Sequence, residues 1–166
     1  FTMWKDVQNY FPGHTIINRG FGGSSLPDVI RYADDIIIPY SPKQIMIYCG
    51  ENDFAGSDTV TAQLVFARFK QLFSIIREHY AKVKITYVSM KPSPSRVRLM
   101  PKMMEANLLI KNFLKKKKKT SFVDVYYSML EADGKPIESI FLADKLHMNA
   151  QGYAIWQKLI EPHLLK

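Results

Sequence analysis

Short apolar blocks alternate along the chain with longer segments of helical periodicity. The apolar blocks lie at residues 15–17, 44–48, 83–89 and 122–125, and each is typical of a short buried strand. Between them, apolar residues recur every three or four positions, which predicts helices over residues 2–10, 25–33, 58–80, 99–117 and 149–165. This alternation predicts an α/β fold in which four parallel strands are joined by crossover helices.

The pattern also predicts a single domain over residues 1–166, because no internal repeat divides the sequence. A parallel α/β sheet normally opens with a strand that leads into the first helix. This sequence instead opens within a segment predicted to be helical. We therefore expect the first strand, and the turn that follows it, to lie upstream of Phe1.

The formal net charge of +8 comes in large part from five consecutive lysines at residues 115–119. Such a run can attract nucleic acid or anionic lipid, or it can be a solvated helix end, where lysines offset the helix dipole. The second interpretation is favoured because no aromatic platform or arginine-rich motif accompanies the lysines. No nucleic-acid partner is therefore expected.

Two further features of the composition exclude other classes of protein. Cys49 is the only cysteine, so an internal disulfide and a cysteine-based metal site are excluded. No apolar run approaches the ~20 residues that span a bilayer, so no membrane span is expected. Residues upstream of Phe1 would decide whether a signal peptide exports the protein.

Three polar clusters follow the predicted elements of the sheet. N-R-G-F-G-G follows the first strand at residues 18–23, G-E-N-D follows the second at 50–53, and D-K-L-H at 144–147 precedes the last helix. In open parallel sheets, binding sites form at the carboxyl ends of the strands. These clusters are therefore the candidates for a functional site.

The residue types in the clusters suit acyl transfer. Gly22 and Gly23 allow backbone N–H groups to approach an anionic oxygen, and the amide of Asn52 is a neutral donor for a tetrahedral oxyanion. His147 can act as a general base whose tautomer Asp144 fixes. Taken singly, each feature has a simpler interpretation, namely a turn, a helix cap or a surface pair. The hypothesis of acyl transfer therefore rests on the three clusters occurring together, in this order, on an α/β pattern.

In this order the clusters resemble the second, third and fifth sequence blocks of the SGNH (GDSL-type) hydrolases, and the resemblance extends over nearly the whole chain. It implies that Gly23 is the backbone oxyanion donor, Asn52 the side-chain donor, His147 the base and Asp144 its partner. It also implies a flavodoxin-like, three-layer α/β/α fold, with strand order 2-1-3-4-5 and the absent strand in a central position.

The resemblance leaves the nucleophile unaccounted for. The family's first block holds a serine in a turn before the first helix, and that position falls upstream of Phe1. Ser24 and Ser25 follow the glycine turn but are more simply helix-capping residues. Ser93 and Ser95 lie in the proline-containing loop after the third strand, and Arg96 in that loop either holds a substrate oxygen or pairs with a carboxylate.

These features together predict a serine ester hydrolase that acts on short-acyl esters, acetyl among them, of carbohydrate or lipid through an acyl-enzyme. Such chemistry requires no metal ion or organic cofactor. The alternative is a non-catalytic binding domain on the same fold, which would hold a carbohydrate or an anionic partner. A Gly-x-Ser sequence upstream of Phe1 would distinguish the enzyme from the binding domain.

Overall fold

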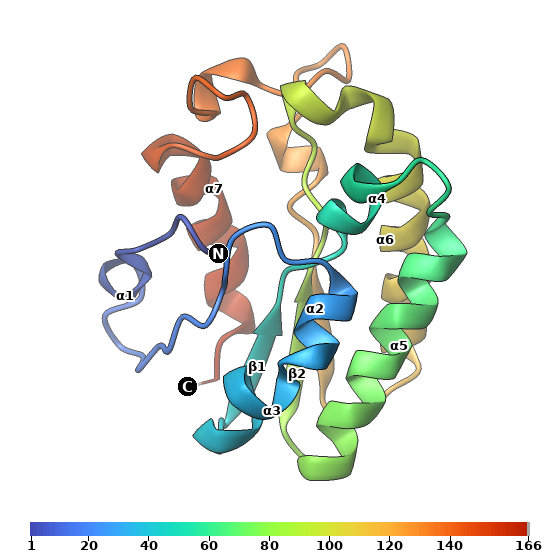
Figure 1. Cartoon of the computed structure of the whole chain (residues 1–166). Helices are drawn as coiled ribbons and strands as arrows, with labels where there is room; N and C mark the ends of the chain where they lie inside the picture. The colour runs from blue at the N-terminus through green and yellow to red at the C-terminus, as the bar shows by residue number, and fades with distance from the viewer. Residues whose placement is uncertain (166) are drawn as a thin grey trace.

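Three parallel strands form the centre of the protein in a computed structural model that describes residues 1–165 (Figure 1). They are β1 (Gln44–Ile47), β2 (Lys84–Val88) and β3 (Thr120–Val123), hydrogen-bonded in the order β1-β2-β3. The register places Gln44 beside Lys84 and Ile85 beside Thr120. The predicted α/β class with a parallel sheet is confirmed.

Helices and short 3-10 turns connect and cover the strands. In chain order they are α1 (Val7–Tyr10), α2 (Leu26–Arg31), α3 (Ala33–Ile36), η1 (Ile38–Tyr40), α4 (Glu51–Gly56), α5 (Ala62–His79), η2 (Pro94–Leu99), α6 (Met100–Lys115), η3 (Tyr127–Met129), η4 (Glu138–Ile140), α7 (Ala150–Ile160) and η5 (Glu161–His163). Within residues 1–165, none of these helices has both the length and the apolar character needed to cross a membrane.

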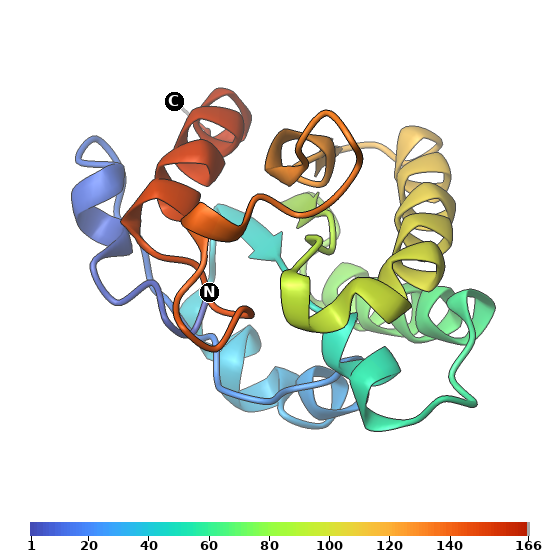
Figure 2. The same cartoon turned by 90° about the horizontal axis from the view of Figure 1, so that it is seen from above.

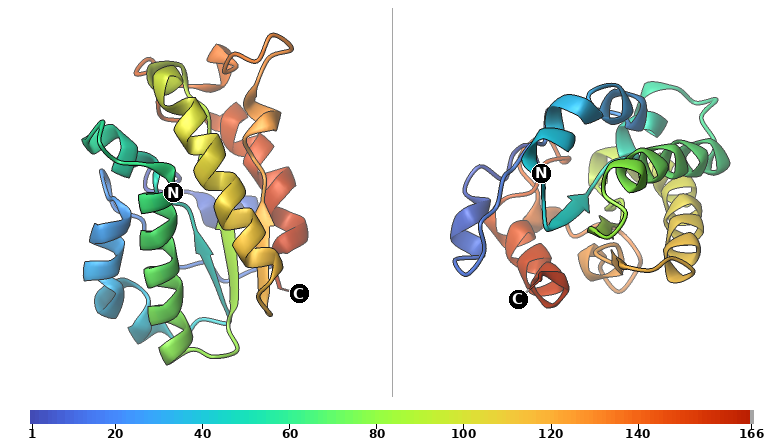
Figure 3. Two further views of the ribbon diagram at one scale, coloured as in Figure 1. Left: turned by 90° about the vertical axis from the view of Figure 1, so that its right-hand side faces the viewer. Right: turned by 90° about the horizontal axis from the view of Figure 1, so that it is seen from below.

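The sheet is buried on both faces, and this divides the core into two clusters. Ile45 and Ile47 of β1 pack with α2, α5 and α6, whereas Met46 between them faces the cluster that contains Trp156 of α7. Seen from below, α7 lies on one side of β1, and α5 and α6 lie on the other (Figure 3). Successive side chains of a strand point to opposite faces of the sheet, and both faces are covered by apolar residues. The strand sequences are therefore almost entirely apolar rather than alternating between apolar and polar residues.

The two longest helices begin where their sequences provide a start signal. The side chain of Thr61 accepts a hydrogen bond from the Leu64 N–H at 3.2 Å, so α5 begins at Ala62 rather than at Asp58. Pro101 lies in the first turn of α6, where its missing N–H costs no hydrogen bond. The inward positions of α5 recur at helical spacing and are fully or almost fully buried: Val65, Phe69, Leu72 and Ile76.

Helix α7 contacts η4 closely because it contains a glycine. The Asn149 side chain caps α7 by accepting from the N–H groups of Gln151 and Gly152, at 2.9 and 3.3 Å. A Cβ atom on Gly152 would lie 2.8 Å from the carbonyl oxygen of Ile140 and 2.8 Å from the Cβ of Met148. The close approach holds the loop between Ile140 and Met148 against the start of α7.

The start of the chain departs from the sequence prediction. The segment predicted as a helix over residues 2–10 is helical only in α1, and residues 15–17 form no strand. The Ile16 N–H donates to the side chain of Gln8 at 3.0 Å instead. A strand requires a neighbouring strand for its hydrogen bonds, and no described strand runs beside residues 15–17. The predicted count of four strands is therefore wrong for residues 1–165, which contain three.

The side chain of Asn107 connects α6 to the chain leaving β2. Its Oδ1 accepts from the Met90 N–H at 2.9 Å, and its Nδ2 donates to the Met90 carbonyl at 3.0 Å. Both residues are buried. The amide thus replaces the two hydrogen bonds that a further residue of strand would provide, and it fixes the direction in which the chain leaves the sheet.

We expect Asn107→Ala to lower the free energy of unfolding by about 2–4 kcal/mol, because it leaves two buried backbone groups of Met90 unpaired. Urea unfolding at neutral pH measures the change. The matched control is Asn112→Ala, an exposed position on the same helix, for which a change within about 0.5 kcal/mol is expected. Equal effects at the two positions would contradict this role for Asn107.

Candidate active site

Four segments meet above the carboxyl ends of the strands (Figure 2). Each either follows a strand or leads into a helix that packs on the sheet: the loop at 18–25, α4, the segment 91–96 after β2, and the loop 142–147 before α7. The parallel direction of the strands brings these sequence-distant segments to one edge of the sheet.

Hydrogen bonds between the segments fix their relative positions. Nδ2 of Asn52 donates to the carbonyl oxygen of Ser24 at 2.9 Å, which connects α4 to the glycine-rich loop. The N–H of Ser95 donates to the carbonyl oxygen of Lys145 at 3.0 Å, which connects the segment after β2 to the loop before α7. The backbone around the edge of the sheet is thereby cross-linked in two places.

His147 and Asp144 form a hydrogen-bonded pair within the loop 142–147. Nδ1 of His147 lies 2.6 Å from Oδ2 of Asp144, and Oδ1 of Asp144 accepts from the N–H groups of Leu146 and His147, each at 2.9 Å. The His147 hydrogen bond, followed by the two N–H groups, lowers the pKa of Asp144 to about 2. Asp144 is therefore a carboxylate at neutral pH.

The pair leaves the second nitrogen of the imidazole, Nε2 of His147, without a hydrogen-bond partner among residues 1–165. The His147 side chain is 46% exposed. A carboxylate on Nδ1 favours the tautomer with its proton on Nδ1 and stabilises the imidazolium formed when Nε2 accepts a proton. The arrangement is chemically suited to general-base catalysis.

The Asn52 amide is held in one orientation. Nη2 of Arg96 donates to Oδ1 of Asn52 at 2.9 Å, while Nδ2 donates to Ser24. A guanidinium has no acceptor, so the oxygen of the amide must face Arg96 and the nitrogen must face the glycine-rich loop. The second N–H of Nδ2 makes no hydrogen bond within residues 1–165.

A buried ion network lies directly beneath this amide. The Glu51 side chain accepts from Arg96 at 2.8 Å, from Lys91 at 3.3 Å and from the hydroxyl of Tyr48. Burial alone would raise the pKa of Glu51, but Lys91, Arg96 and the Tyr48 hydroxyl together hold it below the usual value. Arg96 thus connects the buried carboxylate to the oriented amide of Asn52.

Gly23 lies in the loop that Asn52 contacts, with a left-handed backbone at φ 72°. A side chain at this position would meet no atom within 4 Å, so the glycine is required by the backbone conformation rather than by space. The residue after it, Ser24, is the one whose carbonyl accepts from Asn52. The structure therefore brings Gly23 and Asn52 to neighbouring parts of the same edge.

The hydroxyl groups of Ser24 and Ser25 are both engaged locally. Ser24 donates to the carbonyl oxygen of Phe21 at 2.9 Å. Ser25 donates through Oγ and through its N–H to the carboxylate of Asp28, at 2.6 and 2.8 Å, at the start of α2. The capping role predicted for Ser25 is confirmed.

The two serines of the proline-rich loop differ in their surroundings. Ser93 is completely buried, and its hydroxyl has no hydrogen-bond partner among residues 1–165. Ser95 is exposed, and its backbone contacts Lys145. Neither hydroxyl is hydrogen-bonded to His147. Of the two roles left open for Arg96, the structure shows the pairing with a carboxylate.

Two further contacts at this edge were not predicted from the sequence. Asp53 is buried and accepts from the N–H of Leu26 at 2.8 Å and from Arg68 at 2.7 Å, which fixes the start of α2 against α4. Glu51 and Lys91 form the other contact. The one feature of the sequence that could have indicated these contacts is the presence of charged residues shortly after the apolar blocks at 44–48 and 83–89. Among residues 1–165, no three histidine, cysteine or acidic side chains gather as a metal site would require.

A family model of GDSL-like lipases and acylhydrolases matches residues 3–155. No curated protein sequence matches the chain. Among solved structures, a Streptococcus pneumonia protein provisionally assigned as a platelet activating factor superposes with a TM-score of 0.85. It is 18% identical, over 99% of this chain and 79% of that one.

Two other solved structures are similar. A GDSL-like lipase from Bacteroides thetaiotaomicron has a TM-score of 0.79 at 23% identity, over 93% of this chain and 78% of that one. A catalytic mutant of an acetylxylan esterase from Geobacillus stearothermophilus has a TM-score of 0.74 at 16% identity, over 94% and 75%. At these identities the likeness establishes the shared fold.

The network around Glu51 predicts a pH-dependent stability. A carboxyl group with a lowered folded pKa stabilises the fold above its unfolded pKa of about 4.5, and this stability is lost as the pH falls through the folded value. We expect Glu51→Gln to reduce the free energy of unfolding by about 3 kcal/mol at pH 7, because Lys91 and Arg96 lose their counter-charge. The deficit should shrink below pH ~4.

Urea unfolding of the two proteins between pH 3 and pH 7 measures this difference. Glu131→Gln is the control, since Glu131 is exposed, and its effect should stay within about 0.5 kcal/mol at every pH. A deficit for Glu51→Gln that is constant over this range would show that the charge of Glu51 does not contribute.

Proposed function

The chain belongs to the GDSL-like lipase/acylhydrolase family, and from this premise we propose that it is a serine ester hydrolase that removes short acyl groups through an acyl-enzyme. The observation that carries the proposal is the Asp144–His147 pair. An ionised carboxylate holds Nδ1 of the imidazole and leaves Nε2 without a partner among residues 1–165, at the edge of the sheet that also carries the candidate oxyanion donors.

We place the nucleophilic serine, with the first strand of the domain, upstream of Phe1. The support comes from where Phe1 lies: its ring packs edge-on against Tyr48 and Trp156, with centroids 5.9 Å away in each case. Figure 2 shows this end of the chain among the segments of the candidate site. A chain continuing upstream from Phe1 therefore starts at the edge that holds His147.

In the proposed reaction, the serine oxygen attacks the ester carbonyl while Nε2 of His147 accepts the hydroxyl proton. The tetrahedral intermediate collapses, the C–O bond to the alcohol breaks, and His147 returns the proton to the leaving alkoxide. Water then attacks the acyl-enzyme by the same route and releases the carboxylic acid and the free serine. Asp144 remains ionised throughout and stabilises the imidazolium.

The oxyanion of each tetrahedral intermediate is assigned to the backbone N–H of Gly23 and to Nδ2 of Asn52. The Asn52 amide is oriented before substrate binds, because Arg96 and the Ser24 carbonyl hold it. Donors that need no reorganisation stabilise a developing charge more than mobile ones do. Arg96 acts in this scheme as a positioning residue.

Acetyl esters of carbohydrates are the substrates we favour. The fold is shared with an acetylxylan esterase and with a carbohydrate esterase of family 3 from Talaromyces cellulolyticus. Short-chain p-nitrophenyl esters and acetylated xylo-oligosaccharides are suitable test substrates.

We expect His147→Ala, in the complete protein with its upstream segment, to reduce hydrolysis of p-nitrophenyl acetate at least ~10³-fold, because the serine loses its base. His79→Ala is the matched control at an exposed position at the end of α5, and it should keep wild-type turnover. Turnover that is unchanged in His147→Ala would exclude His147 as the base. A complete protein that carries no serine upstream and no activity would instead be a binding domain.

We expect Asn52→Ala to lower kcat by ~10²–10³ with little change in KM, because the donor acts on the transition state and the backbone donor remains. Asn52→Asp should lose at least as much, since a carboxylate cannot donate. Asn112→Ala serves again as the control. Wild-type kcat in Asn52→Ala would remove this residue from the oxyanion site while leaving the assignment of His147 intact.

A further inference from the structure

The edge of the sheet opposite the candidate active site carries a hollow lined by lysines. It has a volume of about 330 Å³, and its lining residues are Lys43, Lys82, Lys84, Lys119, Thr120 and Leu165. The four lysines lie around the starts of the three strands: one directly precedes β1, one precedes β2, one begins β2, and one directly precedes β3. Parallel strands begin at one edge of a sheet, so the fold gathers these charges.

The register of the sheet shows how closely the charges are gathered. Gln44 lies beside Lys84, and Ile85 lies beside Thr120. Neighbouring strands are about 4.8 Å apart, so the backbones of Lys43, Lys84 and Lys119 begin three adjacent strands. Nζ of Lys84 donates to the carbonyl oxygen of His163 at 2.5 Å, which holds that ammonium group at the edge.

No carboxylate of residues 1–165 lies within 4 Å of these four ammonium groups, whereas Lys91, Lys111, Lys135 and Lys145 all have such partners. The local positive potential also acts on His163, whose pKa is lowered first by burial and then by the charge of Lys84. Four like charges around one hollow repel one another unless an anion lies between them.

Arg77 holds together two of the chain segments that line the hollow. Nη1 donates to the carbonyl oxygens of Tyr80 and Val83, at 3.3 and 2.6 Å, in the connection before β2. Nη2 donates to those of Lys118 and Lys119, at 3.2 and 3.1 Å, in the connection before β3. One guanidinium therefore cross-links two of the three connections that carry the lysines.

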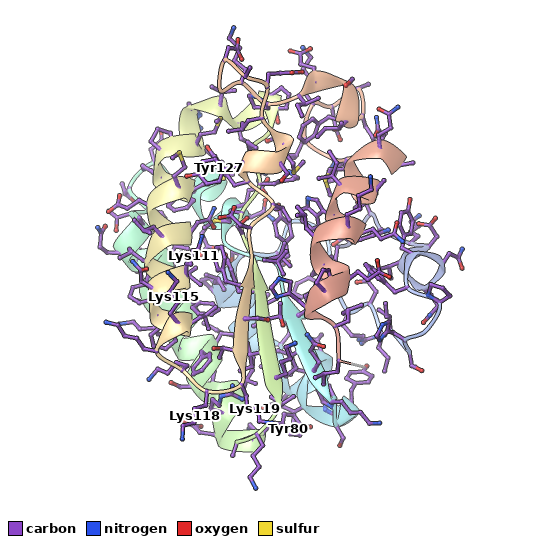
Figure 4. All side chains as sticks on the ribbon, turned by 180° about the vertical axis from the view of Figure 1, so that it is seen from behind. Tyr80, Lys111, Lys115, Lys118, Lys119 and Tyr127 are labelled. Atoms are coloured by element: carbon purple, nitrogen blue, oxygen red, sulfur yellow. The ribbon has the colours of Figure 1, made fainter. Side chains whose placement is uncertain are left out.

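The basic surface continues beyond the hollow. Figure 4 shows Lys118 and Lys119 beside Tyr80 at this end of the molecule, with Lys115 farther along α6. Lysines 115–119 are all exposed, and the ammonium group of Lys117 lies 4.9 Å from the ring centroid of Phe113. A ligand with several anionic groups would meet further charges outside the hollow.

We propose that this hollow binds a phosphate or sulfate group of a larger polyanionic ligand. Lysine ammonium groups act as point charges that suit a tetrahedral oxyanion, whereas carboxylates are typically matched by the fork of an arginine. The nearby Arg77 already donates to four carbonyl oxygens. No aromatic side chain lines the hollow, so the stacking platform that single-stranded nucleic acid uses is absent from its lining.

The site is independent of ester hydrolysis, because it lies at the amino ends of the strands and His147 lies at the other edge. Ligand binding there leaves the candidate active site open. A phosphorylated or sulfated polymer held at the basic edge would raise the local concentration of its own acyl esters near His147. Binding is measurable without any ester substrate, so its outcome does not depend on the proposed reaction.

Calorimetric titration of the complete protein with inorganic tripolyphosphate and with heparin tests the proposal, and the two probes distinguish phosphate from sulfate. We expect Lys43→Gln/Lys82→Gln to weaken binding of the preferred probe about tenfold and to reduce its salt dependence. These two side chains are exposed and make no hydrogen bond within residues 1–165, so the fold should be kept. Lys84→Gln/Lys119→Asn removes the other pair, with asparagine accepting the left-handed backbone at residue 119.

The matched control is Lys5→Gln/Lys158→Gln, which removes the same charge from two exposed positions elsewhere. It should bind as the wild type does. Equal weakening in the control would show that only the overall charge matters, and this would overturn the site. Absence of binding by either probe at low salt would overturn it as well. A single-stranded oligonucleotide that bound more tightly than both probes would assign the surface to nucleic acid instead.

Discussion

Glu51 is a carboxylate buried where β1 ends, and the candidate active site is organised around the need to neutralise it. An unpaired buried carboxylate costs several kcal/mol, so Lys91 and Arg96 must approach it from the segment after β2. Once Arg96 lies there, its other nitrogen reaches Oδ1 of Asn52 and fixes the amide. A constraint of folding therefore sets the orientation of a group proposed to act in catalysis.

The two edges of the sheet differ in how their charged side chains are paired. At the carboxyl edge, the acidic groups of Glu51, Asp53 and Asp144 are paired with cations, backbone N–H groups or a histidine. At the amino edge, four lysines surround a hollow without a carboxylate partner within residues 1–165. Parallel strands make this separation simple, since every connection before a strand reaches one edge and every connection after it reaches the other.

Both edges are held in place by side-chain contacts to main-chain atoms. Asn107 fixes the exit from β2, Asp53 fixes the start of α2, and Arg77 cross-links the connections before β2 and β3. Such contacts satisfy backbone groups that the regular hydrogen bonds of helices and strands leave unpaired. They position loops more firmly than loop sequences alone would, and functional residues in parallel sheets lie on loops.

The sequence by itself determined the α/β class, the helices α2, α5, α6 and α7, and the strands β1, β2 and β3 to within a few residues, because these depend on periodicity and local caps. It also identified the segments holding Gly23, Asn52 and the Asp144–His147 pair. Only the tertiary structure decided that residues 15–17 form no strand, since a strand requires a partner. It also decided that Arg96 pairs with Glu51 and that the lysines of three loops meet at one hollow. These outcomes depend on which distant residues become neighbours, and local sequence patterns carry no information about that.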